Sequence, residues 1–289
     1  MNRFPAPALM LGSVLSIQFG QAIGKQLAGT VGAAGVVALR LGLAAALLLL
    51  LLHRPALPRS RMDIGVIVGF GSAIAGMNLI YPALTLLPLG LASALQLLGP
   101  ITLALLTSRR VLDAGCAVLA AGGVWLFYAP NGARFPLGGV LLALASGACM
   151  AAYLLLSKQA GTKSTGGGAL ALALAWAAAL TVPLGMMQQG THLLSPRILL
   201  TGLVVAVLSA VLPYSLELAA LRRLPARTAG VLASLEPASA GLAGVLVLDE
   251  HLRTAQWAAL ACVGTASAGT VIRREAERPR DPQRRPAPP

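Results

Sequence analysis

Two charged side chains lie within long apolar stretches of the sequence and are the first candidates for chemistry. Glu236 stands directly before Pro237, and Arg40 stands between Leu39 and Leu41. Charged groups at membrane depth are costly and usually mark functional sites. A carboxylate there can bind a proton or the amine of a substrate, and a guanidinium can hold a carboxylate through two hydrogen bonds. Glu236 is therefore a candidate coupling or amine-binding residue, and Arg40 a candidate partner for a carboxylate.

Each of these candidates also has a purely structural interpretation. Glu236 can be satisfied by neighbouring helices, and Arg40 can extend its side chain to the membrane interface. Glu217 is a third acidic candidate, and it can instead reach the interface or pair with Arg222 or Arg223. The residue types alone do not separate these alternatives.

Uncharged polar side chains occur in several other apolar stretches. They are Gln18, Gln21, Asn78, Tyr81, Gln96, Tyr153 and Tyr214. Each of them alone can serve helix–helix hydrogen bonding. Their distribution leaves the stretches 113–129, 167–187 and 254–272 almost without polar groups. This pattern predicts a polar cavity ringed by some helices, with an outer layer of scaffold helices.

Membrane helices must position these side chains. The chain has 289 residues, of which 57% are apolar and 11% charged, whereas a soluble domain averages about 45–50% apolar and about 25% charged residues. The apolar segments are 7–28, 34–52, 64–86, 89–107, 113–129, 138–157, 167–187, 197–218, 227–248 and 254–272. A spanning helix needs roughly 20 such residues, and open strands cannot satisfy their backbone in lipid. The sequence therefore predicts an all-α membrane protein with ten transmembrane helices.

The distribution of basic residues predicts the orientation of the chain. With the N-terminus in the cytoplasm, 17 of the 22 Lys and Arg residues lie on the cytoplasmic side and four on the opposite side. Such an excess is typical of cytoplasmic loops, so both termini are predicted to be cytoplasmic. The net charge of +13 is then a membrane-surface feature. Nucleic acid is not an expected partner, because only 4% of the residues are aromatic and stacking platforms need aromatic side chains.

Two pairs of prolines indicate an internal repeat. Pro88 and Pro225 precede the fourth and ninth segments, and Pro100 and Pro237 lie within them, each pair separated by 137 residues. Proline removes a hydrogen bond from the helix ladder. Pro100 and Pro237 are therefore expected to break their helices at equivalent depths.

The repeat divides the chain into two halves of five helices each. We expect the first repeat over residues 1–133, the second over 134–272, and a disordered basic cytoplasmic tail over 273–289. Because five is odd, the second repeat must be inverted relative to the first. Inverted repeats are a recurrent design of secondary transporters, in which one site opens alternately to each side of the membrane.

Signatures of other functions are missing from the sequence. There is no phosphate-binding P-loop, and the three Cys and three His residues show no metal-ligand spacing. We expect no enzyme activity, no metal and no cofactor. The expected partners are a small-molecule substrate, protons and the lipid bilayer, and the sequence does not indicate an oligomeric state.

Several stretches of the chain resemble a known family. They are Val31-Gly32-Ala33-Ala34-Gly35-Val36 with Ala38-Leu39-Arg40-Leu41, Gly76-Met77-Asn78, Pro88-Leu89-Gly90, Ser108-Arg109-Arg110 with Asp113, Leu212-Pro213-Tyr214-Ser215-Leu216-Glu217, and Leu224-Pro225-Ala226-Arg227-Thr228 leading to Glu236-Pro237. With the inverted repeat, they resemble the EamA-type branch of the drug/metabolite transporter superfamily. Within it, the chain is most similar to exporters of threonine and homoserine in the bacterial inner membrane.

The resemblance implies a multi-pass protein of the bacterial inner membrane that exports small amino acids, by alternating access and in exchange for protons. An exporter of drugs or other metabolites is an alternative within the superfamily, and a membrane scaffold without transport, or an intramembrane enzyme, is an alternative outside it. The chain departs from the family at Gln96, where such exporters often carry Glu.

Overall fold

The computed structural model describes residues 5–52, 60–106, 111–128, 135–163, 168–221, 223–224 and 226–276. Every regular element in these ranges is helical. The elements are α1 (Ala6–Leu52), α2 (Arg61–Met77), α3 (Ile80–Leu84), α4 (Leu89–Leu106), α5 (Val111–Tyr128), α6 (Leu137–Lys163), α7 (Gly168–Gln189), the 3-10 helix η1 (Gly190–Leu194), α8 (Pro196–Ala206), the π-helix η2 (Val207–Val211), α9 (Leu212–Leu221), α10 (Ala226–Ala233), α11 (Glu236–Leu248) and α12 (Thr254–Ala276). The predicted all-helical class is confirmed for this part of the chain.

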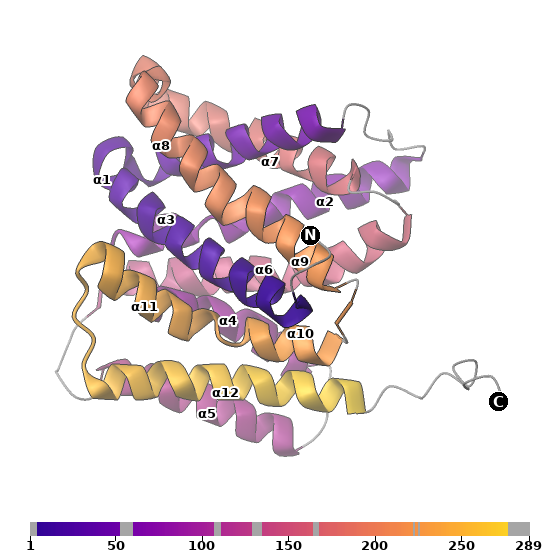
Figure 1. Ribbon diagram of the computed structural model, residues 1–289, viewed down its shortest axis with the longest axis vertical. Helices are drawn as coiled ribbons and strands as arrows, with labels where there is room; N and C mark the ends of the chain where they lie inside the picture. Colours follow the sequence, from indigo (N-terminus) through magenta and orange to yellow (C-terminus); the bar gives the residue numbers. More distant parts are fainter. Residues whose placement is uncertain are drawn as a thin grey trace.

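Helix α1 contains two antiparallel stretches joined at Gly32. The backbone there has φ 64° and ψ 166°, a combination that is essentially restricted to glycine. Figure 1 shows α1 turning back on itself. The predicted segments 7–28 and 34–52 thus lie within one continuous element, with almost no loop between them.

Six described helical stretches are long and apolar enough to cross a membrane: Ala6–Leu51, Arg61–Leu84, Leu137–Leu156, Gly168–Leu194, Pro196–Glu217 and Val231–Leu248. Helices α4 and α5 carry the shorter apolar stretches Leu89–Leu103 and Val118–Phe127. The predicted count of ten spanning helices in two inverted repeats is not confirmed. The expected repeat boundary at 133–134 lies outside the described residues. Helix α12 continues through Ala276, past the expected start of the tail at 273. The rest of the expected tail, 277–289, lies outside them.

The two prolines that were expected to break helices behave differently. Pro237 lies in the first turn of α11, and the chain is not helical between Ala233 and Glu236. Pro100, in contrast, lies inside the continuous helix α4, so the expectation of a break there is corrected. Pro100 has no N–H to donate to the carbonyl of Gln96. This carbonyl packs closely against α6: a Cβ added at Gly147 would lie only 2.5 Å from its oxygen. Close packing by a neighbouring helix allows proline inside a membrane helix.

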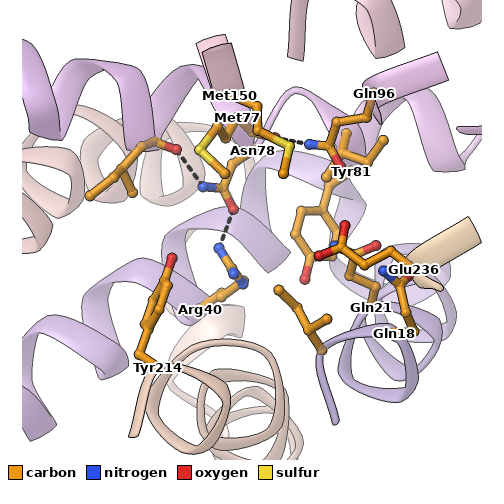
Figure 2. A pocket seen from close by; sticks show the side chains of 13 residues that line it. Gln18, Gln21, Arg40, Met77, Asn78, Tyr81, Gln96, Met150, Tyr214 and Glu236 are labelled. Atoms are coloured by element: carbon orange, nitrogen blue, oxygen red, sulfur yellow. Dashed lines mark hydrogen bonds between the residues drawn. The ribbon is translucent and has the colours of Figure 1, made fainter. Parts of the chain in front are cut away.

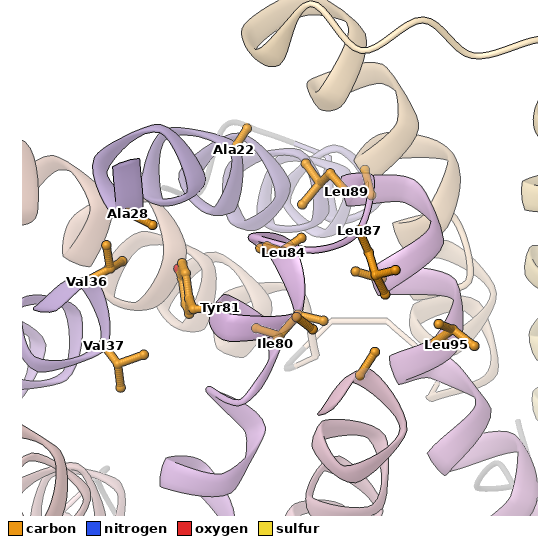
Figure 3. Packing of buried hydrophobic residues seen from close by; sticks show 14 of the residues in the cluster. Ala22, Ala28, Val36, Val37, Ile80, Tyr81, Leu84, Leu87, Leu89 and Leu95 are labelled. Carbon is orange, nitrogen blue, oxygen red and sulfur yellow. The ribbon is translucent and has the colours of Figure 1, made fainter. Parts of the chain in front are cut away.

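Helix α1 has a central place in the bundle. It packs against α7, α8, α9 and α11, while α5 packs against α12 on the outside. Buried side chains of α1 and α4 meet those of the short helix α3, as Figure 3 shows for Val36, Tyr81, Leu84 and Leu89. The first turns of α1 and the last turns of α12 lie toward the same side in Figure 1.

Candidate functional site

A cavity of about 60 Å³ lies between helices of the bundle. Its lining comes from α1, α2, α3, α4, α6, α9 and α11: Ile17, Gln18, Gln21, Arg40, Ile74, Met77, Asn78, Ile80, Tyr81, Gln96, Met150, Tyr214 and Glu236. A water-sized probe fills about 10–15 Å³, so the space suits a few water molecules or a small solute. None of the described residues of α5, α7 or α12 lines this cavity.

Eight of the ten polar candidates named from the sequence line this cavity, and Tyr153 and Glu217 do not. The eight are Gln18, Gln21, Arg40, Asn78, Tyr81, Gln96, Tyr214 and Glu236. Glu217 does not line it, although it lies on α9 three residues beyond Tyr214 and is partly buried. In Figure 2, Arg40, Asn78 and Tyr214 lie on one side of the cavity, Glu236, Gln18 and Gln21 lie on the other, and Tyr81 lies between.

Arg40 is held firmly by the protein. Its side chain is only 7% exposed, so it does not extend to an interface. Its Nε donates to Ser209 Oγ at 2.7 Å, its Nη1 to Asn78 Oδ1 at 2.6 Å, and its Nη2 to the Ser209 carbonyl at 2.8 Å. Its guanidinium carbon lies 5.8 Å from the centre of the Tyr81 ring, within range of a cation–π contact. A guanidinium has five N–H donors, so these three bonds leave donor capacity for a ligand.

Breaks in two helices create the acceptors that hold Arg40. Pro213 has no N–H to give to the carbonyl of Ser209 four residues earlier, and the chain there forms the π-helix η2. Asn78 lies between α2 and α3 and donates its own amide to the Ile74 carbonyl at 2.7 Å. The orientation of this amide fixes Asn78 Oδ1 toward Arg40.

Glu236 is the only acidic residue among those that line the cavity. It is the first residue of α11, directly before Pro237. Within the described part of the chain, its carboxylate forms no hydrogen bond and no ion pair. The alternative in which neighbouring helices satisfy Glu236 finds no such contact among these residues.

Gln96 takes part in a separate hydrogen-bond network on α4. Its Nε2 donates to Ser146 Oγ at 2.7 Å, and Ser146 Oγ donates to the Met77 carbonyl at 2.5 Å. The Met77 carbonyl needs these donors because α2 ends at Met77. The amide of Gln96 therefore acts as a donor, a role that an ionised Glu at this position could not fill.

Several residues that build the site are not among those predicted from the sequence. Ser209 is the most informative, because its position four residues before Pro213 predicts an unbonded carbonyl in an apolar helix. Ser146 and Ser93 support Gln96 and Gln18 through hydrogen bonds of 2.7 and 3.4 Å. A single serine in an apolar helix carries no signal that separates these two from many others.

A second polar cluster, the Lys25–Glu250 cluster, joins α1 to the connection between α11 and α12. Lys25 Nζ forms an ion pair with Glu250 at 2.6 Å and donates to the Leu87 carbonyl at 2.8 Å. The Glu250 carboxylate also accepts from the backbone N–H of Leu89 at 3.0 Å. The connection between α11 and α12 lies on the left in Figure 1, away from the first turns of α1 and the last turns of α12. Neither residue was a candidate, because Lys25 lies near the end of the predicted segment 7–28 and Glu250 lies in the predicted loop after 227–248.

The cavity combines one cationic and one anionic side chain with amide and hydroxyl groups. Such a set can hold a small polar molecule that carries both charges. No group of three or more His, Cys, Asp or Glu residues that could hold a metal ion occurs among the described residues.

Known proteins resemble this chain over most of its length. The model of the EamA-like transporter family matches residues 137–272. The threonine/homoserine exporter RhtA of Salmonella typhimurium is 41% identical over 273 residues, which cover 92% of each chain. RhtA of Escherichia coli K12 is 40% identical and covers 91% of this chain and 90% of its own.

Two further relatives extend the comparison. The uncharacterized transporter YwfM of Bacillus subtilis is 32% identical over half of this chain. A protein of known crystal structure has a TM-score of 0.64 at 18% identity and covers 94% of this chain and 98% of its own, which shows a shared fold. The chain belongs to the EamA-like transporter family.

Proposed function

We propose that this protein exports small amino acids of the threonine and homoserine type across the bacterial inner membrane, in exchange for protons. The observation that carries the proposal is the presence of Arg40 and Glu236 in the lining of one small cavity. The proposal is supported by 40–41% identity to proteins named threonine/homoserine exporters. The proposal includes activity as a transporter rather than as an enzyme.

An amino acid carries a negative and a positive charge, which can pair with Arg40 and Glu236 in the cavity lining. Its carboxylate can accept hydrogen bonds from the Arg40 guanidinium, and its ammonium group can bind Glu236. Buried charges are stabilised only when they are paired, so a bound zwitterion neutralises both side chains together. A singly charged solute leaves one of them unpaired, and a neutral solute leaves both unpaired.

Exchange with protons follows from competition at Glu236. The carboxylate can bind either the ammonium group of the substrate or a proton, and the two exclude each other. Proton binding from the periplasm then releases the amino acid there, and substrate binding from the cytoplasm releases the proton. No energy source other than the proton gradient is needed.

Alternating access requires that each end of the cavity can close. We propose ten crossings in two inverted repeats, 1–133 and 134–272, with both termini in the cytoplasm. The turn of α1 at Gly32 supports two crossings by this helix. The Lys25–Glu250 cluster then lies at the periplasmic end, where its contacts among α1, α4 and the α11–α12 connection hold that end closed.

Transport into inside-out vesicles tests the proposal. We expect threonine and homoserine uptake when the vesicle interior is acidic, and loss of that uptake when the gradient is dissipated. Glu236→Gln should abolish the gradient-driven component, whereas Glu217→Gln, which changes a partly buried acid outside the cavity lining, should retain it. Uptake of bulky drugs instead of amino acids would favour the alternative exporter, and absence of any flux from inserted protein would favour a scaffold.

A further inference from the structure

Two buried polar atoms in the cavity lining have no hydrogen-bond partner among the described residues. They are the hydroxyl of Tyr81 and the Oε1 atom of Gln21. Tyr81 is 1% exposed and Gln21 is 7% exposed, so bulk water does not satisfy them. Buried polar groups in native proteins are nearly always hydrogen-bonded. Both residues line the cavity, which indicates that a molecule inside the cavity supplies the missing partner.

The Tyr81 hydroxyl cannot move to another partner. The edge of its ring packs on α1 at Gly24, where an added Cβ would lie 2.6 Å from the ring atom Cε1. Arg40 lies over the ring, 5.8 Å from its centre. Gln21 precedes Gly24 by three residues and therefore lies on the same face of α1. The packing thus presents the Tyr81 hydroxyl and the Gln21 amide to the same cavity, as Figure 2 shows.

A hydroxyl group matches the chemistry of both atoms. Gln21 Oε1 can only accept a hydrogen bond, whereas the Tyr81 hydroxyl can donate one. A hydroxyl group donates and accepts at once, so it satisfies both atoms together. An ammonium group cannot accept the bond from Tyr81, and a methyl group satisfies neither atom.

We propose that Tyr81 and Gln21 bind the side-chain hydroxyl of the substrate and thereby select hydroxyl-bearing amino acids. This inference rests on the proposed function, in which Arg40 and Glu236 bind the main-chain charges of the same molecule. Tyr81 donates to the substrate oxygen, and the substrate hydroxyl donates to Gln21 Oε1. Valine has nearly the shape of threonine but carries a methyl group in place of the hydroxyl, so it leaves both atoms unpaired.

Competition between threonine and valine tests this selectivity. In inside-out vesicles we expect the wild type to take up threonine with at least a roughly 10-fold higher kcat/KM than valine, since an unsatisfied buried polar group is costly. Tyr81→Phe and Gln21→Met should each lower this ratio about 5-fold or more, because each removes one bond to the hydroxyl. Tyr153→Phe is the matched control, because Tyr153 stacks on Phe70 and does not line the cavity. It should retain the wild-type ratio.

A binding measurement separates this inference from the proposed function. In detergent, threonine should raise the Tm of the wild type more than valine does, and this difference should shrink in Tyr81→Phe and Gln21→Met. The inference is overturned if the wild type does not discriminate, or if both variants keep the wild-type ratio and Tm difference. The proposed function fails on a different result, namely no gradient-dependent uptake of any small amino acid by the wild type.

Discussion

At the scale of single residues, the cavity contains a guanidinium that is positioned by three hydrogen bonds. Arg40 bonds Ser209 twice and Asn78 once, and each acceptor is turned toward it by a nearby helix irregularity. Its charge is therefore fixed in the cavity before a ligand arrives. A flexible cation at the same position would first lose side-chain entropy on binding.

We expect Arg40→Lys to lower threonine uptake roughly 10-fold or more, because hydrogen bonds to charged groups contribute about 1.5–3 kcal/mol each. The lysine ammonium group keeps the charge but cannot reproduce the planar set of donors. Vesicle uptake measures the effect, and Arg197→Lys, at an exposed position on α8, is the matched control. Equal losses in the two variants would contradict the role of Arg40.

Gln96→Glu tests whether the amide at this position is needed as a donor. The introduced carboxylate would accept from Ser146, and the Met77 carbonyl would lose the hydrogen bond that Ser146 now donates. We expect a stability loss of about 1–3 kcal/mol, seen as a lower Tm in detergent. An unchanged Tm would show that a Glu at this position is accommodated without cost.

At the scale of elements, the site depends on irregular backbone rather than on complete helices. The turn of α1 at Gly32, the interruption between α2 and α3, the π-helix η2 and the start of α11 at Glu236 bring groups from distant segments to one cavity. Non-helical backbone at membrane depth is tolerated where it lines such a space. These irregularities are therefore the elements most sensitive to substitution.

Gly32→Ala should destabilise the protein, because a Cβ is incompatible with φ 64° and ψ 166°. Strained backbone of this kind costs about 1–3 kcal/mol. Gly29→Ala is the matched control, because a Cβ at this helical position meets no atom within 4 Å; it should be neutral or stabilising by about 0.5–1 kcal/mol. Thermal unfolding in detergent measures both variants, and a Tm for Gly32→Ala at or above that of Gly29→Ala would contradict the geometry.

At the scale of the whole molecule, the Lys25–Glu250 cluster ties distant parts of the chain together. Glu250→Gln removes the ion pair with Lys25 and weakens the bond from the Leu89 N–H. The reporter is a cysteine introduced at Ile17, in the cavity lining, in a protein whose native cysteines are replaced. We expect this cysteine to react several-fold faster with a periplasmic maleimide when Glu250→Gln is present than when Glu250 is retained. Asp249→Asn, at the neighbouring exposed position, should leave the labelling rate unchanged. Equal rates in wild type and Glu250→Gln would show that the cluster does not restrict access.

The sequence predicts the cavity better than it predicts the backbone. Isolated polar residues such as Glu236 and Asn78 are identifiable because lipid makes them costly anywhere but in a cavity. Breaks are harder, because Pro100 remains inside a helix while the interruption at Asn78 has no proline at the break itself. What decides each case is packing by a neighbouring helix, as at Gly147, and this packing is not encoded in the local sequence.

Proton release on substrate binding is the measurement that tests exchange at Glu236. Threonine should displace a proton from Glu236 when it is added to unbuffered, detergent-purified protein, and a pH indicator should report this release. The account predicts acidification with the wild type and none with Glu236→Gln. The same release from both proteins, or threonine binding to the wild type without any release, would contradict exchange of substrate and proton at Glu236.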